Sequence, residues 1–224
     1  MTSVAIVEDH LLFAQALEIT LTLEGYDVVR EDIWDWSPPS RLLTNLLRAH
    51  PHIALLDLDL DRAGHGVRLI EALTRAHISV VVLTASKDRA RWGECLSYGA
   101  CAVLSKAAPL DAIRATLRRI GERRPVLTCE ERAELVAEFD QEQVRTVGVR
   151  RRLDLLTPRE REVLAHLMRG RPVREIAQLS FVSEATVRTQ VKSILAKLEV
   201  TSQLAAVGAA HLVDWRPPEL ATAR

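Results

Sequence analysis

The fold is decided by a short apolar run, IALLDL at residues 53–58, which carries one charged side chain, Asp57. A run of this length that is apolar on both faces is typical of a strand buried on both sides. A second such run, ISVVVLT at residues 78–84, follows a segment in which apolar residues recur at helical spacing. Buried strands that alternate with amphipathic helices predict a parallel sheet with helices on both faces.

This alternation extends to about residue 120. The predicted strands cover residues 3–7, 26–30, 53–58, 78–84 and 100–105, and the predicted helices cover residues 11–24, 40–49, 66–76, 87–98 and 109–120. Ser40 is expected to cap the second helix. The repeated order predicts an α/β fold, a doubly wound (βα)5 parallel sheet, in residues 1–121. In such sheets ligands bind beyond the carboxyl ends of the strands.

The composition narrows the class of protein. Hydrophobic residues make up 48% and charged residues 27% of the 224 residues, which argues against disordered, collagen-like and coiled-coil proteins. Three cysteines without a C-x-x-C pair exclude a disulfide framework and a cysteine-based zinc site. The start MTSVAIVEDH lacks the apolar run of a signal peptide, and no stretch is long enough to cross a membrane. We therefore expect a soluble, cytoplasmic, reduced protein with no membrane partner.

The formal net charge of zero hides an uneven distribution. The first 120 residues carry 13 basic and 15 acidic side chains, whereas residues 151–224 carry 12 basic and 8 acidic ones, a net charge of +4. A basic C-terminal part beside an acidic N-terminal part suggests that only the C-terminal part meets an anionic polymer. Chance explains a difference of this size equally well, so charge alone decides nothing.

Polar side chains follow four of the predicted strands. The residues concerned are Glu8 and Asp9, Asp57, Thr84, and Lys106. Clustered carboxylates raise one another's pKa values unless a cation joins them, and a hard cation such as Mg²⁺ prefers carboxylate and carbonyl oxygens. Such a pocket suits a phosphoryl group, with Asp57 as nucleophile, the metal and Lys106 neutralising oxygens, and Thr84 donating a hydrogen bond. Any one of these residues alone is commonly a cap, a turn or a solvated charge.

These residues resemble those of a response-regulator receiver domain. The resemblance implies that Asp57 is the phosphoacceptor, that Asp9 ligates Mg²⁺ directly, and that Glu8 acts through water. It also implies that Asp59 gives the metal its backbone carbonyl, and that Thr84 and Lys106 hold the phosphoryl group. The implied donor is a phosphohistidine on a partner sensor histidine kinase, which often docks on the first helix, here near Leu11, Leu12 and Phe13.

The sequence departs from this family at three places. Ala107 replaces the proline that usually follows Lys106, so the family's common cis peptide bond is not expected there, and the other two departures matter for switching. Val103 stands where the family usually has an aromatic residue, so the ring that swings inward after phosphorylation is missing. The loop after Asp57, LDLDRAGHG, lacks the usual Met-Pro and is one residue longer. Both departures favour an alternative in which the protein binds DNA without phosphorylation, under the control of a ligand or a protein partner.

Residues 122–152 are predicted to form a linker that is partly helical. Thr128 and Glu131 have the spacing of a capping box, and a modest apolar stripe continues to about Val144. A short tether, VGVRRR, is expected behind this helix. An extra helix of either neighbouring domain is an equally good interpretation.

Residues 153–216 are predicted to form an all-α helix-turn-helix domain with four helices. Thr157, Pro158 and Glu160 supply the cap, first-turn proline and capping-box acid of a first helix that ends at Gly170. A short second helix begins near Val173, Ser183 signals the third, and Thr201 is expected to cap the fourth. The third helix presents Ala185, Arg188, Thr189, Lys192 and Ala196 opposite its apolar stripe, a composition that suits the DNA major groove.

The motifs LTPREREVL, REIA and FVSEATVRTQVKSILAKL resemble the LuxR/FixJ-type helix-turn-helix. The resemblance implies base contacts from Arg188, Thr189 and Lys192 in a recognition helix at residues 184–198. The flanking polar residues suit phosphate contacts, namely Thr186, Gln190, Ser193 and Lys197. The fourth helix often forms the dimer contact in this family, here around Leu204, Val207 and His211.

The favoured interpretation is a transcription factor that phosphorylation switches and that binds double-stranded DNA as a homodimer. A remote alternative is an enzyme, because LLDLDLD resembles the D-x-D of haloacid-dehalogenase phosphatases, with Asp59 as acid/base. That class places its D-x-D on the first strand and needs further acids after the lysine. Here Asp111 is the only acid between residues 107 and 121, so we expect no enzyme of this class.

Overall fold

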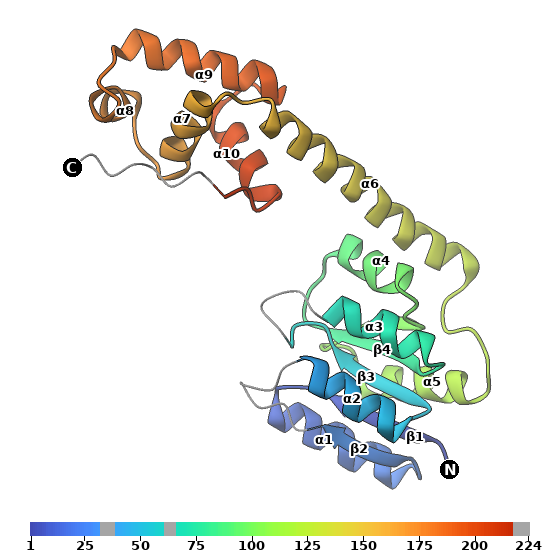
Figure 1. The fold of residues 1–224 in the computed structure, drawn as a ribbon. Helices are drawn as coiled ribbons and strands as arrows, with labels where there is room; N and C mark the ends of the chain where they lie inside the picture. Colours follow the sequence, from blue (N-terminus) through green and yellow to red (C-terminus); the bar gives the residue numbers. More distant parts are fainter. Residues whose placement is uncertain (32–38, 61–65, 217–224) are drawn as a thin grey trace. The chain divides into compact units, whose positions relative to one another are not determined.

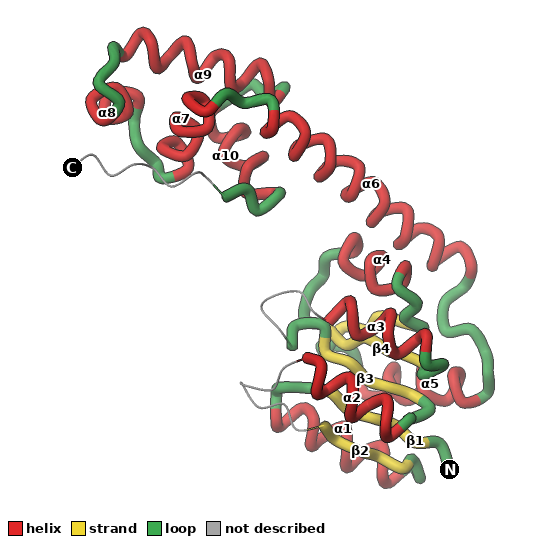
Figure 2. The backbone as a smooth tube through the Cα atoms, viewed as in Figure 1, coloured by secondary structure: helices red, strands yellow, loops and turns green. Residues whose placement is uncertain are grey.

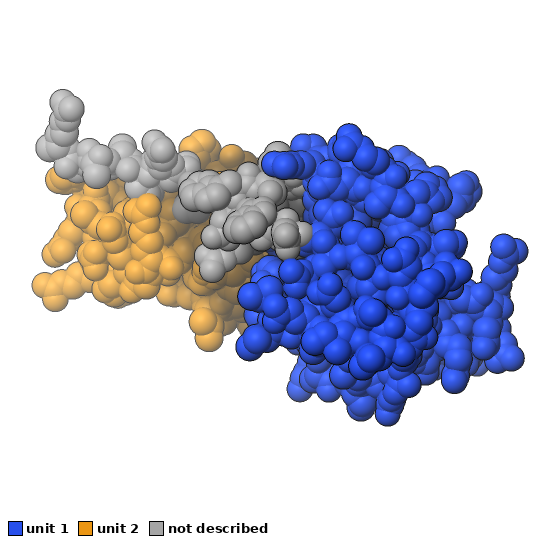
Figure 3. Space-filling model, turned by 90° about the horizontal axis from the view of Figure 1, so that it is seen from below, with its two compact units in different colours: residues 1–140 blue, residues 141–224 orange. Residues whose placement is uncertain are grey.

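The computed structural model describes residues 1–31, 39–60 and 66–216. The chain divides into two compact units, and the division falls between Asp140 and Gln141 (Figure 3). The longer loop predicted after Asp57 lies largely outside the described residues. None of the helices in the described ranges combines the length and apolar character needed to cross a membrane.

The first unit is built on a five-stranded parallel sheet, as the alternating pattern predicts (Figures 1 and 2). The strands are β1 (Ser3–Val7), β2 (Asp27–Glu31), β3 (Ile53–Asp57), β4 (Ser79–Thr84) and β5 (Ala102–Ser105). Their order in the sheet is β2-β1-β3-β4-β5. The connecting helices are α1 (Leu11–Leu23), α2 (Pro39–Ala49), α3 (Gly66–Arg75), α4 (Arg89–Ser97) and α5 (Leu110–Gly121).

Alternate strand residues form two cores on opposite faces of the sheet. Ala54, Leu56, Val80 and Val82 pack with residues of α2, α3 and α4, whereas Ile53, Leu55, Val81 and Leu83 pack with residues of α1 and α5. Because successive strand side chains point to opposite faces, strands that are apolar at every position require helices on both faces. In the four strands other than β2, polar residues therefore stand only at the strand ends.

Helix α6 (Cys129–Asp154) is longer than the sequence analysis predicts. Its start is confirmed, because Thr128 and Glu131 form the predicted capping box. The Thr128 N–H donates to Glu131 Oε2 at 2.8 Å, and the Glu131 N–H donates to Thr128 Oγ1 at 3.1 Å. The expected tether VGVRRR is wrong, because these residues are helical. Gly148 costs a helix about 1 kcal/mol relative to alanine. Burial of Val149 and Leu153 in the core of the second unit is worth roughly 1.5–3 kcal/mol for each side chain and outweighs this cost.

The second unit contains the predicted helices α7 (Pro158–Met168), α8 (Val173–Leu179), α9 (Glu184–Leu198) and α10 (Gln203–Leu212). The capping box at Thr157 and the Ser183 cap of α9 are confirmed. Ser202, rather than the expected Thr201, caps α10 by accepting from the Ala205 N–H. Ser40 likewise lies inside α2, which already begins at Pro39. These differences are shifts of one or two residues, the usual uncertainty at helix ends.

Candidate functional site

The register of the parallel strands gathers the predicted polar residues at one edge of the sheet. Val7 is paired with Leu56, Asp57 with Leu83, and Thr84 with Ser105. Glu8 and Lys106, which directly follow β1 and β5, therefore lie at the same edge as Asp57 and Thr84. We call Glu8, Asp9, Asp57 and Lys106 the acidic pocket.

Lys106 is the centre of the acidic pocket. Its ammonium Nζ donates to Glu8 Oε1 and to Asp57 Oδ2, both at 2.7 Å. The second carboxylate oxygen of Asp57, Oδ1, accepts from the backbone N–H of Asp59 at 3.0 Å. Glu8 and Asp57 are buried, with 5% and 1% of their surfaces exposed. Two buried carboxylates thus share one ammonium, and the pocket has an excess of negative charge.

This environment changes the acidity of the groups. Burial raises the pKa of Asp57 to about 6, although the hydrogen bond from Lys106 opposes the change. Burial lowers the pKa of Lys106, but hydrogen bonds to Asp57 and Glu8 outweigh it, so that its pKa is raised. A bound cation would oppose the effect of burial, lower the pKa of Asp57 and keep this carboxylate ionised over a wider range of pH.

The donor set around Asp57 fits a hard cation. Ligand atoms of Glu8, Asp9, His10 and Asp57 all lie within 4.8 Å of one another. Glu8 Oε2 is buried without a hydrogen-bond partner among the described residues, and a cation would satisfy it. The sequence pattern indicates no role for His10. Its Nδ1 lies 2.8 Å from Asp9 Oδ1, and only its position next to the acidic pair could have indicated it.

The structure directs the Asp59 and Thr84 side chains toward each other. Thr84 Oγ1 donates to Asp59 Oδ2 at 3.4 Å and accepts from the Ser86 N–H at 3.0 Å. The other oxygen of Asp59 pairs with Arg91 Nη1 at 3.4 Å. The Asp59 carboxylate is therefore engaged by Thr84 and Arg91, and it is not one of the four clustered ligand groups. Nothing in the sequence pattern marked Arg91.

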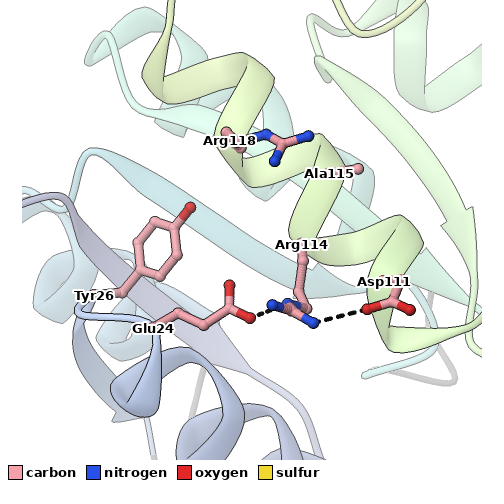
Figure 4. Close-up of a pocket in the computed structure, with 6 residues that line it drawn as sticks. All are labelled: Glu24, Tyr26, Asp111, Arg114, Ala115 and Arg118. Atoms are coloured by element: carbon pink, nitrogen blue, oxygen red, sulfur yellow. Dashed lines mark hydrogen bonds and ion pairs between the residues drawn. The ribbon is translucent and has the colours of Figure 1, made fainter.

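A separate cavity of about 430 Å³ lies between the end of α1 and helix α5 (Figure 4). Glu24, Asp111, Arg114 and Arg118 line it together with Tyr26 and Ala115. Arg114 pairs with both Glu24 and Asp111. Its two acids and two arginines balance in charge, so this cavity has neither the excess charge nor the buried carboxylates of the acidic pocket.

Helix α9 exposes the residues that the sequence analysis proposed for base contacts. Arg188, Thr189 and Lys192 are exposed, as are Thr186 and the small Ala185 and Ala196. Arg188 is held by Glu184, one turn earlier, at 2.8 Å, and the Thr189 hydroxyl donates to the Ala185 carbonyl. Val187, Val191, Ile194 and Leu198 are buried on the opposite side. The helix can therefore present two cations without disturbing its own core.

Three of the flanking residues proposed for phosphate contacts are partly buried and not on this exposed face. Lys197 Nζ donates to Glu160 Oε2 at 2.7 Å, and Ser193 Oγ donates to Glu160 Oε1 at 2.6 Å. Gln190 is half-buried, and its side-chain oxygen is enclosed without a partner among the described residues. Lys197 and Ser193 thus join α9 to α7 inside the unit. Helical spacing in the sequence places Ser193 and Lys197 beside the proposed DNA-binding face. It does not indicate that both bind Glu160.

Burial alone would raise the pKa of Glu160, but hydrogen bonds from Lys197, Ser193 and Thr157 outweigh it and lower the pKa from 4.5 to about 2. A depressed carboxyl pKa stabilises the fold above its unfolded value, and this stability is lost as the pH falls from about 4.5 to about 2. Glu160→Gln is expected to remove this acid sensitivity, worth about 3 kcal/mol. Urea unfolding of the full chain at several pH values, followed by NMR signals of α9, measures it.

Glu162→Gln is the matched control for this change, because Glu162 is half-exposed and pairs only locally with Arg159. It should keep the acid sensitivity of the wild type. An equally steep loss of stability in Glu160→Gln and the wild type between pH 4.5 and pH 2 would contradict the role assigned to Glu160.

Comparison with known families covers both units. The model of the response regulator receiver domain matches residues 4–118, and the model of bacterial regulatory proteins of the luxR family matches residues 154–210. Among curated relatives, the transcriptional regulatory protein DegU of Brevibacillus brevis is 28% identical over 220 residues, covering 91% of this chain and 90% of DegU. The transcriptional regulatory protein DesR of Bacillus subtilis (strain 168) is 23% identical over 224 residues, covering 96% of this chain and 99% of DesR.

A solved structure of the two-component response regulator RcsB in complex with DNA is similar in fold, with a TM-score of 0.50. It is 24% identical and covers 95% of this chain and 98% of that chain. At this identity the likeness concerns the fold alone. The receiver model, by contrast, matches more than half of the chain, and the luxR-family model matches the helices that follow α6. The chain therefore belongs to the response regulators and joins a receiver domain to a luxR-type DNA-binding domain.

Proposed function

We propose that Asp57 accepts a phosphoryl group from a sensor histidine kinase and that this modification controls DNA binding through α9. In this proposal the receiver comprises residues 1–121, the linker residues 122–152 and the DNA-binding domain residues 153–216. The observation that carries it is the contact of Lys106 with both Asp57 and Glu8 at 2.7 Å, in a pocket that bears excess negative charge. A carboxylate can act as the nucleophile in phosphoryl transfer, and a neighbouring ammonium can neutralise charge on the phosphoryl oxygens.

In the transfer step, a carboxylate oxygen of Asp57 attacks the phosphorus of the phosphohistidine. A bond between this oxygen and phosphorus forms, and the bond between phosphorus and the histidine nitrogen breaks. The nitrogen keeps the electron pair and takes up a proton from solvent, so the products are an aspartyl phosphate and a neutral histidine. Lys106 neutralises part of the charge that the phosphoryl oxygens bring.

Glu8, Asp9 and Asp57 are the carboxylates that would hold Mg²⁺, with the backbone carbonyl of Asp59 as a further ligand and His10 beside them. Their oxygen ligands and the unpartnered Glu8 Oε2 suit this ion. When bound, Mg²⁺ neutralises phosphoryl charge and keeps the carboxylates ionised. The residues of the chain do the remaining work of orienting Asp57 and enclosing the site.

For the DNA-binding domain we propose that α9 enters the major groove, with Arg188, Thr189 and Lys192 at the bases and Thr186 at the backbone. Gln190 and Lys197 remain proposed phosphate contacts, Lys197 at the cost of its bond to Glu160. We further propose a homodimer that reads two half-sites about one helical turn apart. Leu204 on α10, 82% exposed, supports a contact between copies there.

The proposal predicts that Asp57→Ala abolishes the response to phosphorylation without abolishing DNA binding. Duplexes selected from a random library provide the binding site, and their affinity for the full chain is measured with and without acetyl phosphate and Mg²⁺. Acetyl phosphate is expected to change the affinity of the wild type and of the control Asp27→Ala, whose carboxylate is exposed on β2. A response of Asp57→Ala equal to that of the wild type would contradict the proposal.

A second candidate function is a regulator that binds DNA without phosphorylation. Val103 favours it, because this small side chain is already buried in the core at the position where the family usually has a mobile aromatic ring. In the same experiment this candidate predicts selective DNA binding by the wild type and no phosphoryl uptake from acetyl phosphate.

A further inference from the structure

The hydroxyl of Thr84 is already engaged in the unphosphorylated chain. Thr84 is fully buried, and its single hydroxyl proton is donated to Asp59 Oδ2 at 3.4 Å. The Thr84 oxygen also accepts from the Ser86 N–H. A hydroxyl has only one proton, so Thr84 cannot donate a second hydrogen bond. The resemblance to receiver domains implies that this hydroxyl holds the phosphoryl group on Asp57, so Asp59 and the phosphoryl group compete for one hydrogen bond.

Asp59 connects this hydroxyl to helix α4. Its other carboxylate oxygen pairs with Arg91, which lies in the first turn of α4, at 3.4 Å. The backbone N–H of Asp59 also donates a hydrogen bond to Asp57 Oδ1, which holds the two aspartates close together. Negative charge added to Asp57 therefore appears close to the Asp59 carboxylate and repels it.

Helix α4 in turn is tightly joined to the first part of α6. The Arg132 guanidinium donates to the carbonyls of Leu96 and Ala100, at 2.5 and 3.0 Å, and Arg89 pairs with Glu138 at 2.8 Å. The backbones approach so closely that a Cβ built on Gly93 would lie 1.9 Å from the Leu135 carbonyl oxygen. Any displacement of α4 thus reaches residues 129–140, the part of α6 in the first unit.

We propose that Thr84, Asp59 and Arg91 form a latch that restrains α4 until Asp57 is phosphorylated. The phosphoryl group takes the Thr84 hydrogen bond and repels Asp59, Arg91 is released, and α4 moves together with residues 129–140 of α6. This inference rests on the proposed phosphorylation of Asp57. It connects Asp57 to residues 129–140 of α6 through polar contacts. These contacts would replace the aromatic residue that the family usually has at the position of Val103.

The exposure of the latch suits a switch. The side chains of Arg91 and Asp59 are 43% and 44% exposed, and ion pairs of such exposure contribute little to stability. A restraint of this strength biases the position of α4, and one new charge at Asp57 is enough to remove it.

Hydrogen exchange of the full chain tests the latch. We expect Arg91→Met to speed exchange in α4 and residues 129–140 by about two- to fivefold, the rate change that corresponds to loss of the ion pair. Asp59→Asn should give the same increase, and the double variant should add nothing, because both changes remove one interaction. Arg91→Lys, which keeps a cation facing Asp59, should restore slow exchange.

The matched control is Arg75→Met, which removes another exposed arginine from an ion pair, that with Glu71 in α3. It should leave exchange in α4 and in residues 129–140 unchanged. Exchange of β1 amides should stay constant in every variant, which separates release of the latch from general destabilisation.

Phosphoryl uptake from acetyl phosphate is measured on the same samples. In the wild type, uptake is expected to speed exchange of the same segments, whereas Arg91→Met should respond little further. Uptake by the wild type together with wild-type exchange in Arg91→Met would overturn the latch and leave the proposed function intact. No uptake at Asp57 by the wild type would overturn both.

Discussion

Replacement of both Arg188 and Lys192 by alanine is expected to lower the affinity for a selected DNA duplex by about a hundredfold or more at fixed salt. Each cation that reaches a base edge or a phosphate contributes roughly 1–3 kcal/mol. Both side chains are exposed on the face of α9 opposite its buried stripe, so their removal should not unfold the helix. Fluorescence anisotropy with a labelled duplex measures the change.

Arg216→Ala is the control for this loss, since Arg216 is an exposed cation of the same unit outside α9 and has a side chain that is 89% exposed. It should retain nearly full affinity at the same ionic strength. Affinity of the double variant equal to that of Arg216→Ala would show that α9 is not the reading helix. Weaker binding by both variants to the same small extent would indicate attraction by net charge alone.

Gly93→Ala is expected to separate the first part of α6 from α4. The added methyl would meet the Leu135 carbonyl oxygen at 1.9 Å and Phe139 Cβ at 3.0 Å. Backbone cannot give way as the end of a flexible side chain can, so the helices must move apart, at a cost of about 1–3 kcal/mol. Hydrogen exchange in residues 129–140 should become about tenfold faster or more.

Gly121→Ala provides the comparison, because nothing lies within 4 Å of a Cβ built on Gly121 at the end of α5. It should leave exchange in α6 as it is in the wild type. Slow exchange of residues 129–140 in Gly93→Ala would mean that α6 does not depend on this close approach to α4.

The sequence was sufficient to predict the sheet. Strands with apolar interiors and a polar last residue, as at Asp57 and Thr84, predict a parallel sheet that is covered by helices on both faces. The parallel register then brings the ends of these strands together. The helix starts were equally predictable where a cap was local, as at Thr157 and Ser183. The sequence therefore predicts features that depend on neighbouring residues, such as buried strands and helix caps.

Features that depend on long-range packing could not be predicted in this way. The apolar stripe of α6 was followed only to about Val144, and the helix continues to Asp154 because Val149 and Leu153 are buried in the core of the second unit. Spacing on α9 placed Lys197 beside the DNA face, but its partner Glu160 is 37 residues away. The ion pair of Arg91 with Asp59 likewise joins residues 32 positions apart, for which no local pattern exists.

The direct test of the central claim is chemical mapping of the phosphoryl group. The full chain is treated with acetyl phosphate and Mg²⁺ and then reduced with borohydride, which converts an aspartyl phosphate to homoserine, and the peptides are sequenced by mass spectrometry. We predict homoserine at position 57 and at no other aspartate. Homoserine at Asp9 or Asp59, or none at all while DNA affinity still responds to acetyl phosphate, would contradict the assignment of Asp57 as the phosphoacceptor.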